Sequence, residues 1–211
     1  MKPFAIALLG AESTGKTTLA LSLQERLRAN GKKVVLVPEY LREWCDREGR
    51  TPDRGEQAAI AREQARRVFA ARDADVVIAD TTPLVTAAYS EQLFGDRSLL
   101  AFALEHQRHY AVTLLMGLDL PWVADGFQRD GEHARGALDA SLRLAMADGR
   151  IYWRVVYGND EARMESALAC LGPVAGGMKP PMPARTTAQW RCVNCDDADC
   201  EHRLFSRLRT R

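Results

Sequence analysis

The stretch FAIALLGAESTGKTTL, residues 4–19, decides the fold of this chain. Phe4–Leu9 is a short apolar run that predicts a buried β-strand, and Lys16–Ala29 carries leucines spaced for one buried helix face. Between them, residues 10–17 match the pattern G-x-x-x-x-G-K-T. A glycine-rich turn between a strand and a helix directs backbone N–H groups inward, where they can enclose phosphate oxygens. The context predicts a phosphate-binding loop (P-loop); the alternative is a chance glycine-rich turn.

The residue types in this loop have distinct expected tasks. The glycines allow the tight turn, Lys16 would bring an ammonium to the β- and γ-phosphates of ATP, and the Thr17 hydroxyl would bind Mg²⁺. Lys16 is therefore also a catalytic candidate. The residues expected to contact ATP in this segment are Gly10, Glu12, Ser13, Thr14, Gly15, Lys16, Thr17 and Thr18.

Short apolar runs alternate with longer helical stretches along residues 4–171. The expected strands are Phe4–Leu9, Val34–Val37, Asp75–Ala79, Val112–Met116 and Tyr152–Val156. The expected helices are Lys16–Ala29, Asp53–Arg72, Pro83–Leu93, Arg97–His109, Ala134–Asp148 and Asp160–Leu171. Such alternation predicts an α/β fold with a parallel sheet and right-handed crossovers. Ligands of such sheets bind beyond the carboxyl ends of the strands, so the residues after each strand are the candidates for function.

Bulk properties are those of an ordinary globular protein. The chain has 211 residues, of which 46% are hydrophobic and 27% charged, with a formal net charge of +1. This balance gives no sign of a nucleic-acid or membrane partner. The first apolar run is too short for a signal peptide, and no apolar stretch approaches the roughly 20 residues that span a bilayer. We expect a cytoplasmic protein, and the sequence leaves open whether it forms a homo-oligomer.

Acidic residues follow two of the expected strands. Asp80 comes directly after the third strand, where it would hold Mg²⁺ or activate the acceptor; the alternative is a helix N-cap. Glu39, Tyr40 and Arg42 follow the second strand and would face the acceptor, since a carboxylate can orient a hydroxyl or take its proton. The alternative is a surface ion pair between Glu39 and Arg42. Asp80 and Glu39 are both catalytic candidates.

Two arginines after the fourth strand are candidates for a lid. Small phosphotransferases need cations that close over the transferring phosphoryl group and exclude water. Arg129 and Arg135 have the expected placement, beside a loop that contains Gly126. The alternative is that each is an ordinary solvated arginine.

The motifs together resemble a known family. GAESTGKTTL, Glu39-Tyr40-x-Arg42-Glu43, Ala79-Asp80-Thr81-Thr82 and Pro121-Trp122-x-x-Asp125-Gly126 occur in this order. Over about residues 4–171 the chain is similar to the ribosylnicotinamide kinase domain of NadR-type proteins. The resemblance implies a nucleoside-kinase sheet of strand order 2-3-1-4-5 and ATP- and Mg²⁺-dependent phosphorylation of nicotinamide riboside to its mononucleotide. NadR-type proteins also carry a DNA-binding region and an adenylyltransferase domain, to which the resemblance does not extend.

The resemblance also implies site residues. The riboside would be lined by Glu39, Tyr40, Arg42, Trp122 and Asp125. Trp122, Asp125 and Arg129 would belong to the lid, and the turn with Asn159 and Arg163 would pass the adenine. The family places an aromatic residue before the Glu-Tyr pair, whereas this chain has Pro38, so Tyr40, Trp44 or Trp122 would stack on the base instead. The alternatives are a kinase for another nucleoside or nucleotide and a regulatory P-loop ATPase without kinase activity.

The composition changes after residue 172. We expect a P-loop kinase domain over residues 1–172, a glycine- and proline-rich linker over residues 173–190, and a cysteine-rich tail over residues 191–211. Three thiols and one imidazole in the tail suit a structural Zn²⁺ site, and surface thiols are the alternative. The expected zinc ligands are Cys192, Cys195, Cys200 and His202. Arginines at the end of the tail do not suffice to predict nucleic-acid binding.

Overall fold

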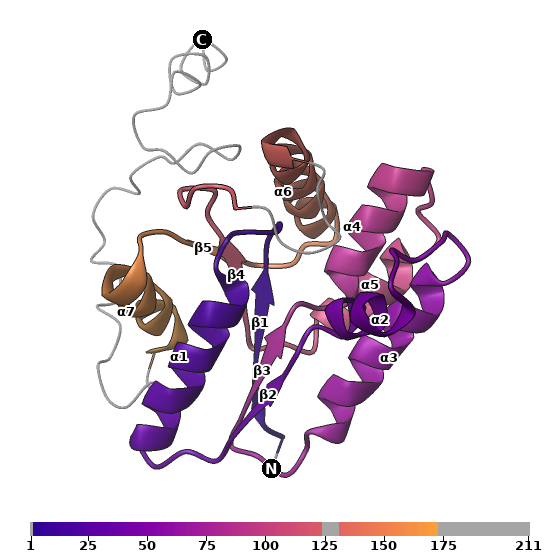
Figure 1. The fold of residues 1–211 in the computed structure, drawn as a ribbon. Coiled ribbons are helices and arrows are strands. Elements are labelled where there is room, and N and C mark those ends of the chain that lie inside the picture. Colours follow the sequence, from indigo (N-terminus) through magenta and orange to yellow (C-terminus); the bar gives the residue numbers. More distant parts are fainter. Residues whose placement is uncertain (1, 124–130, 173–211) are drawn as a thin grey trace, which may run out of the picture.

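A computed structural model describes residues 2–123 and 131–172, the side chains of residues 131–133 excepted. Its centre is a five-stranded parallel sheet in the order β2-β3-β1-β4-β5 (Figure 1). The strands are β1 Phe4–Leu9, β2 Val34–Val37, β3 Val76–Asp80, β4 Val112–Met116 and β5 Arg154–Val156. This order and the α/β class confirm the predicted P-loop kinase fold.

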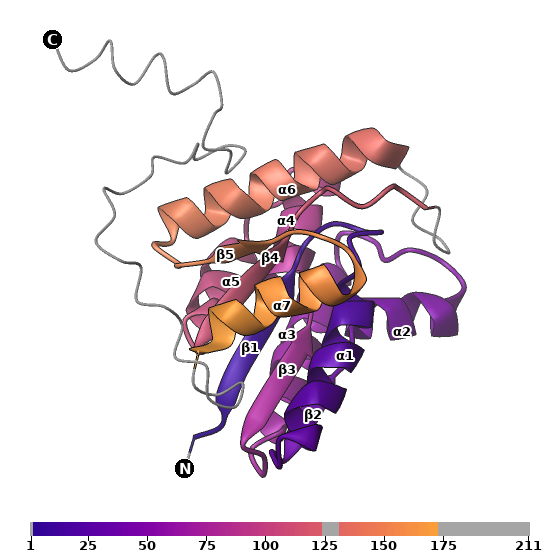
Figure 2. The same ribbon diagram turned by 90° about the vertical axis from the view of Figure 1, so that its left-hand side faces the viewer.

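Helices cover both faces of the sheet, so the domain has three layers (Figure 2). The helices are α1 Lys16–Ala29, α2 Tyr40–Glu48, α3 Gln57–Ala70, α4 Pro83–Phe94, α5 Leu100–Gln107, α6 Gly131–Asp148 and α7 Asp160–Leu171. One face of the sheet packs against α1 and α7, and the other against the layer that contains α3, α4, α5 and α6. No helix in the described part of the chain is both long and apolar enough to cross a membrane.

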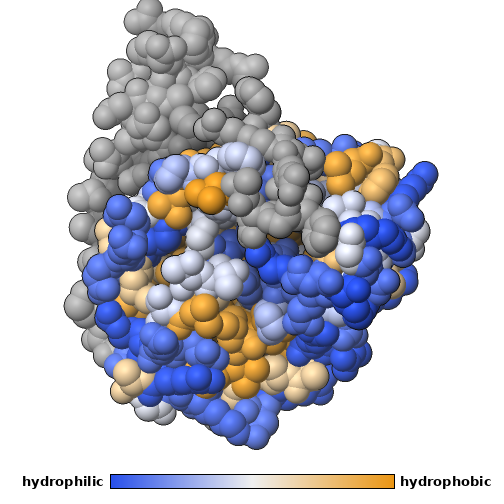
Figure 3. All heavy atoms as spheres, in the orientation of Figure 1, coloured by the Kyte–Doolittle hydropathy of each residue, from blue (hydrophilic) through white to orange (hydrophobic). Residues whose placement is uncertain are grey.

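Side chains of β1 alternate between the two halves of the core. Ile6 and Leu8 pack with the leucines of α1, whereas Leu9 packs with α4 and α6. Because both faces are covered, the strand is apolar at every position and almost fully buried. β2 lies at the edge of the sheet, where Val35 and Leu36 are only half-buried. Figure 3 accordingly shows apolar surface between α1 and α3, over this edge.

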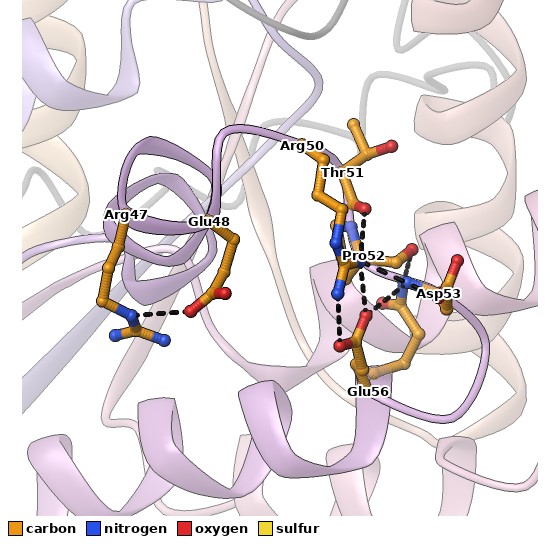
Figure 4. Close-up of polar contacts among 8 residues, drawn as sticks. Arg47, Glu48, Arg50, Thr51, Pro52, Asp53 and Glu56 are labelled. Atoms are coloured by element: carbon orange, nitrogen blue, oxygen red, sulfur yellow. Dashed lines mark hydrogen bonds and ion pairs between the residues drawn. The ribbon is translucent and has the colours of Figure 1, made fainter.

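The region between β2 and β3 differs from the prediction. We expected one long helix over Asp53–Arg72, but two helices are present, α2 and a shorter α3 that begins at Gln57. The Glu56 carboxylate accepts two hydrogen bonds from the Arg50 guanidinium, at 2.8 and 2.7 Å, and one from the Asp53 backbone N–H at 2.8 Å (Figure 4). These donors lower the pKa of Glu56 to about 2. They hold residues 50–56 in a turn, which is why α3 begins later than predicted.

Other element boundaries shift by a few residues. β3 begins and ends one residue later than expected, so Asp80 is the last residue of the strand. α5 covers only the centre of the predicted Arg97–His109 helix, and β5 is two residues shorter at its start. α6 begins three residues earlier than predicted. These shifts leave the order of the strands unchanged.

Burial of His106 on α5 predicts a loss of stability in acid. Its side chain is 3% exposed and lies against the rings of Phe69 and Tyr110. Burial, together with the nearby His109, lowers the pKa of His106 from 6.5 to about 4. Between these values the unfolded chain binds a proton that the folded chain does not, so the free energy of unfolding falls as the pH drops. We expect a loss of about 3 kcal/mol from pH 7 to pH 4, measured by urea denaturation.

A His106→Leu variant is the control for this prediction. It should lose most of the slope between pH 6.5 and 4, because leucine keeps the apolar packing and binds no proton. Carboxylates such as Glu56 and Glu63, whose pKa is about 2, contribute mainly below this window. An unchanged slope in the variant would show that His106 is not the group responsible.

Candidate functional site

The predicted phosphate loop lies between β1 and α1 with two glycines in positive-φ conformations. Gly10 has φ 148° and Gly15 has φ 75°, values that other residues rarely adopt. A Cβ atom at Gly10 would lie 3.0 Å from the Cβ of Met116 and from the Thr14 hydroxyl. Within the loop, the ammonium of Lys16 and the hydroxyl of Thr14 each donate a hydrogen bond of 2.7 Å to the Ala11 carbonyl. The backbone therefore has the tight, left-handed turns that a phosphate cradle needs.

Arg163 of α7 fixes the loop from the side of α1 and α7. Its guanidinium donates to the Thr14 carbonyl at 2.8 Å and to the Gly158 carbonyl at 2.7 Å, and it pairs with Asp119 at 2.7 Å. Asp119 also accepts a hydrogen bond of 2.6 Å from the Gly158 N–H. Arg163 is only 4% exposed, and the carboxylate of Asp119 balances its buried charge. Asn159, predicted beside it at the adenine, is the exposed residue that precedes α7.

The carboxylate of Asp80 lies beside the first turn of α1. Thr17 donates a hydrogen bond of 2.6 Å from its hydroxyl to Asp80 Oδ2. Asp80 is 2% exposed, and its other oxygen, Oδ1, has no hydrogen-bond partner among the described residues. A buried carboxylate oxygen without a donor is costly unless a cation or a water balances it. Because a hydroxyl and a carboxylate oxygen are ligands that Mg²⁺ accepts, these two residues fit a Mg²⁺ ion.

The backbone after Asp80 is strained, and Gln64 of α3 braces it. Thr81 has φ 69°, an unfavourable value for a β-branched residue. The Gln64 amide donates to the carbonyl oxygens of Pro38 at 3.3 Å and Thr81 at 3.5 Å, and it accepts a hydrogen bond of 2.7 Å from the Tyr40 N–H. One buried side chain thus ties together the segments that follow β2 and β3. The sequence analysis did not identify Gln64, whose role depends on contacts distant in sequence.

Glu39 and Tyr40 lie at the corner between β2 and α2. The Glu39 side chain is 12% exposed and forms a weak ion pair of 3.8 Å with the more exposed Arg42. Tyr40 is covered on one ring face by the guanidinium of Arg67, 4.3 Å from the ring centroid. Trp44 of α2 is only 8% exposed, and the guanidinium of Arg50 lies over its ring, 4.9 Å from the ring centroid. Of the three aromatic residues considered for stacking, Trp44 is therefore the least accessible.

Glu12 of the loop points toward α4. Its carboxylate accepts a hydrogen bond of 2.7 Å from the hydroxyl of Tyr89, and the residue is only 6% exposed. We predicted Glu12 as part of the ATP-contacting loop, a task that the backbone N–H of this position can perform. The side chain is directed to a different neighbour, and Tyr89 was not among the predicted site residues.

The segment after β4 lies over the loop. A Cβ at Gly15 would lie 3.1 Å from Leu120, and Ser13 donates a hydrogen bond to the Val123 carbonyl. Arg135 of α6 is 2% exposed and donates to the Leu120 carbonyl at 3.0 Å, while its Nε has no partner among the described residues. The ring N–H of Trp122 likewise lacks one within the described ranges. The predicted lid residues Asp125 and Arg129 lie outside the described residues, as do the linker and the zinc ligands.

The sequence of this chain matches a known protein family. A sequence-family model described as an AAA domain matches residues 5–163, well over half of the chain. The chain belongs to this AAA-domain family. The match contains the phosphate loop, Asp80 and Arg163. A search of curated proteins with the sequence found no significant match.

Two solved structures of NadR proteins resemble this AAA-domain chain. One is a NadR protein in complex with NR, with a TM-score of 0.62 and 19% identity over 84% of this chain and 52% of that one. The other is a NadR protein in complex with NAD and AMP-PNP, with a TM-score of 0.64 and 16% identity over 83% and 50% of the two chains. The chain spans about half the length of either NadR structure. At such identities the likeness establishes the fold, and it confirms the resemblance predicted from the motifs.

Proposed function

We propose that the protein is an ATP- and Mg²⁺-dependent small-molecule kinase that phosphorylates the riboside nicotinamide riboside. The observation that carries the proposal is the Thr17–Asp80 pair, a hydroxyl and a buried carboxylate 2.6 Å apart at the exit of the phosphate loop. It gives the loop a metal-binding corner, the arrangement on which phosphoryl transfer from ATP depends. Two similar structures support this proposal. The NadR structure in complex with NR supports a riboside as the acceptor, and the one in complex with NAD and AMP-PNP supports ATP as the phosphate donor.

The residues have complementary tasks in this proposal. Backbone N–H groups of the loop and the ammonium of Lys16 would hold the β- and γ-phosphates, and Thr17 and Asp80 would hold Mg²⁺. The bound metal would neutralise charge that develops on the phosphate oxygens. Arg163 keeps the loop in shape through the Thr14 carbonyl. The ammonium of Lys16, which donates a hydrogen bond to the Ala11 carbonyl, would turn from this carbonyl to the phosphates.

The transfer itself exchanges one phosphorus–oxygen bond for another. The oxygen of the acceptor hydroxyl forms a bond to the γ-phosphorus, and the bond from that phosphorus to the β–γ bridging oxygen breaks. The electron pair of the broken bond leaves with ADP, and the hydroxyl proton goes to Glu39 or Asp80. Glu39, Tyr40 and Arg42 would line the riboside, with Trp122, Asp125, Arg129 and Arg135 closing the site.

The acidic character of the acceptor corner favours a riboside without a phosphate. Glu39 and Asp80, at the ends of β2 and β3, are largely buried carboxylates, and the Arg42 cation beside them is already paired with Glu39, so they would repel a phosphorylated acceptor. The pyridinium of nicotinamide riboside carries a positive charge, which suits both these carboxylates and an aromatic partner such as Tyr40 or Trp122. The proposal includes a cytoplasmic role in NAD salvage.

Initial rates on a panel of ribosides test the substrate. The panel holds nicotinamide riboside, common purine and pyrimidine ribosides, and their monophosphates, each with Mg²⁺ and ATP. We expect the highest kcat/KM for nicotinamide riboside and no transfer to the monophosphates. A strong preference for an ordinary nucleoside would leave the kinase class intact and overturn the nicotinamide assignment.

The cysteine-rich tail belongs to a separate part of the proposal. We expect purified protein to carry about one Zn²⁺ per chain, bound by Cys192, Cys195, Cys200 and His202. Elemental analysis by mass spectrometry measures it, and a Cys195→Ser variant should lose most of the zinc, whereas Cys45→Ser should retain it. Cys45 is buried in α2 and is the matched cysteine control. Metal-free protein from zinc-supplemented growth would reject this assignment.

A further inference from the structure

We propose that the Glu12 carboxylate binds and orients the acceptor hydroxyl, and that Tyr89 positions Glu12 for this task. The inference rests on the proposed kinase function and deepens it. It gives the loop a second role, since one of its side chains would serve the acceptor while its backbone serves ATP.

The two sides of the loop face different parts of the protein. Thr14 is held by Arg163 from α7, next to the predicted adenine turn. Ala11, at the start of the loop, instead packs into the core formed with α3 and α4. Glu12 follows Ala11 and hydrogen-bonds to Tyr89 of α4. Its side chain therefore lies on the side away from the nucleotide's base.

Tyr89 connects this side of the loop to the acceptor corner. Its ring packs against the cluster formed by Leu41, Trp44 and Cys45 of α2 and Ile60 of α3, as does the ring of Tyr40. Tyr40 directly follows Glu39 at the corner where the acceptor is expected. The Tyr89 hydroxyl thus reaches Glu12 from the same cluster that supports Glu39 and Tyr40.

The chemistry of a carboxylate at this position favours an acceptor role. Phosphates in the loop would repel Glu12, so the residue is a poor ligand for ATP. A buried carboxylate needs hydrogen-bond donors, and an ionised one can accept about four. Tyr89 supplies one, which leaves capacity for the hydroxyl groups of a polyol such as ribose. Because Glu12 belongs to the loop that holds the γ-phosphate, a hydroxyl bound to it would lie next to the reacting phosphorus.

Steady-state kinetics of Tyr89→Phe and Glu12→Gln test the inference. Tyr89→Phe keeps the ring and removes the donor, and we expect kcat/KM for the riboside to fall about tenfold. Glu12→Gln removes the charge and should lower it about a hundredfold. KM for ATP should stay within twofold in both variants. A tenfold change in KM would correspond to about 1.4 kcal/mol of lost binding free energy. A misplaced acceptor should also raise the ratio of ATP hydrolysis to riboside phosphorylation, which loss of structure alone would not do.

Tyr110→Phe is the matched control, because the Tyr110 hydroxyl is buried and has no hydrogen-bond partner among the described residues. It should leave both kinetic constants and the hydrolysis ratio unchanged. If the wild type phosphorylates a riboside and the two variants match it, the inference fails and the kinase function stands. If KM for ATP rises in step with the acceptor effect, Glu12 serves the nucleotide instead. If the wild type transfers phosphate to no acceptor, both the function and the inference fail.

Discussion

A Lys16→Ala variant should phosphorylate the acceptor about a thousandfold more slowly than the wild type. Lys16 is 9% exposed and its ammonium already lies inside the loop, 2.7 Å from the Ala11 carbonyl. In the proposed reaction the Lys16 ammonium binds the β- and γ-phosphates, as a mobile cation that the loop itself supplies. Alanine cannot replace it, and water would enter the space. The rate is measured as product formed at saturating ATP and riboside.

The fold should tolerate this change. The hydrogen bond to Ala11 is lost, but Thr14 donates to the same carbonyl and keeps it satisfied. The free energy of unfolding should therefore change by about 1 kcal/mol or less. Lys32→Ala, at an exposed position after α1, is the control and should keep full activity. Turnover of Lys16→Ala close to that of the wild type would contradict the assignment of the loop.

An Asp80→Asn variant should separate activity from stability. The amide keeps the size of the side chain but removes the charge beside Thr17, and we expect transfer to fall by about a hundredfold to a thousandfold. The stabilisation that Mg²⁺ and ATP give against heat should shrink with it. Without ligands, however, the variant should unfold at an equal or higher temperature. The reason is that a buried carboxylate with an unpartnered oxygen costs free energy in the empty protein.

The control for this prediction is Asp73→Asn, whose carboxylate is 97% exposed and pairs with Lys33 at the surface. It should change neither the rate nor the ligand-dependent stability. If Asp80→Asn lost stability and kept its activity, Asp80 would be a structural residue. It would not be the helix cap that the sequence also allowed, because Thr82 caps α4, through a hydrogen bond of 3.2 Å from the Leu84 N–H.

Elements with a clear apolar run or apolar spacing were predictable from the sequence, and elements dominated by charged residues were not. β1, β2, β4, α1 and α7 have the expected bounds, because their apolar runs or spacing are interrupted by clear turn residues. α2 was missed because charged residues dominate its sequence. Its buried residues Leu41, Trp44 and Cys45 have helical spacing, which is the one signal that would have revealed it.

The candidate site divides in the same way. The loop residues and Asp80 could be named as candidates from the sequence, because the tasks proposed for them depend on a local pattern next to a strand. Tyr89, Gln64 and Asp119 could not, since each acts through contacts far along the chain. Tyr89 is 77 positions from Glu12, and Asp119 is 44 positions from Arg163. Nothing in a single sequence pairs such residues before the order of the strands is known.

The destination of the γ-phosphate of ATP tests the central claim most directly. The protein is incubated with Mg²⁺, nicotinamide riboside and ATP labelled in the γ-phosphate, and the labelled products are separated and identified by mass. We expect the label on the riboside, in an amount equal to the ADP formed. Label found only in inorganic phosphate, at a rate that the riboside does not change, would contradict the account and indicate a regulatory ATPase.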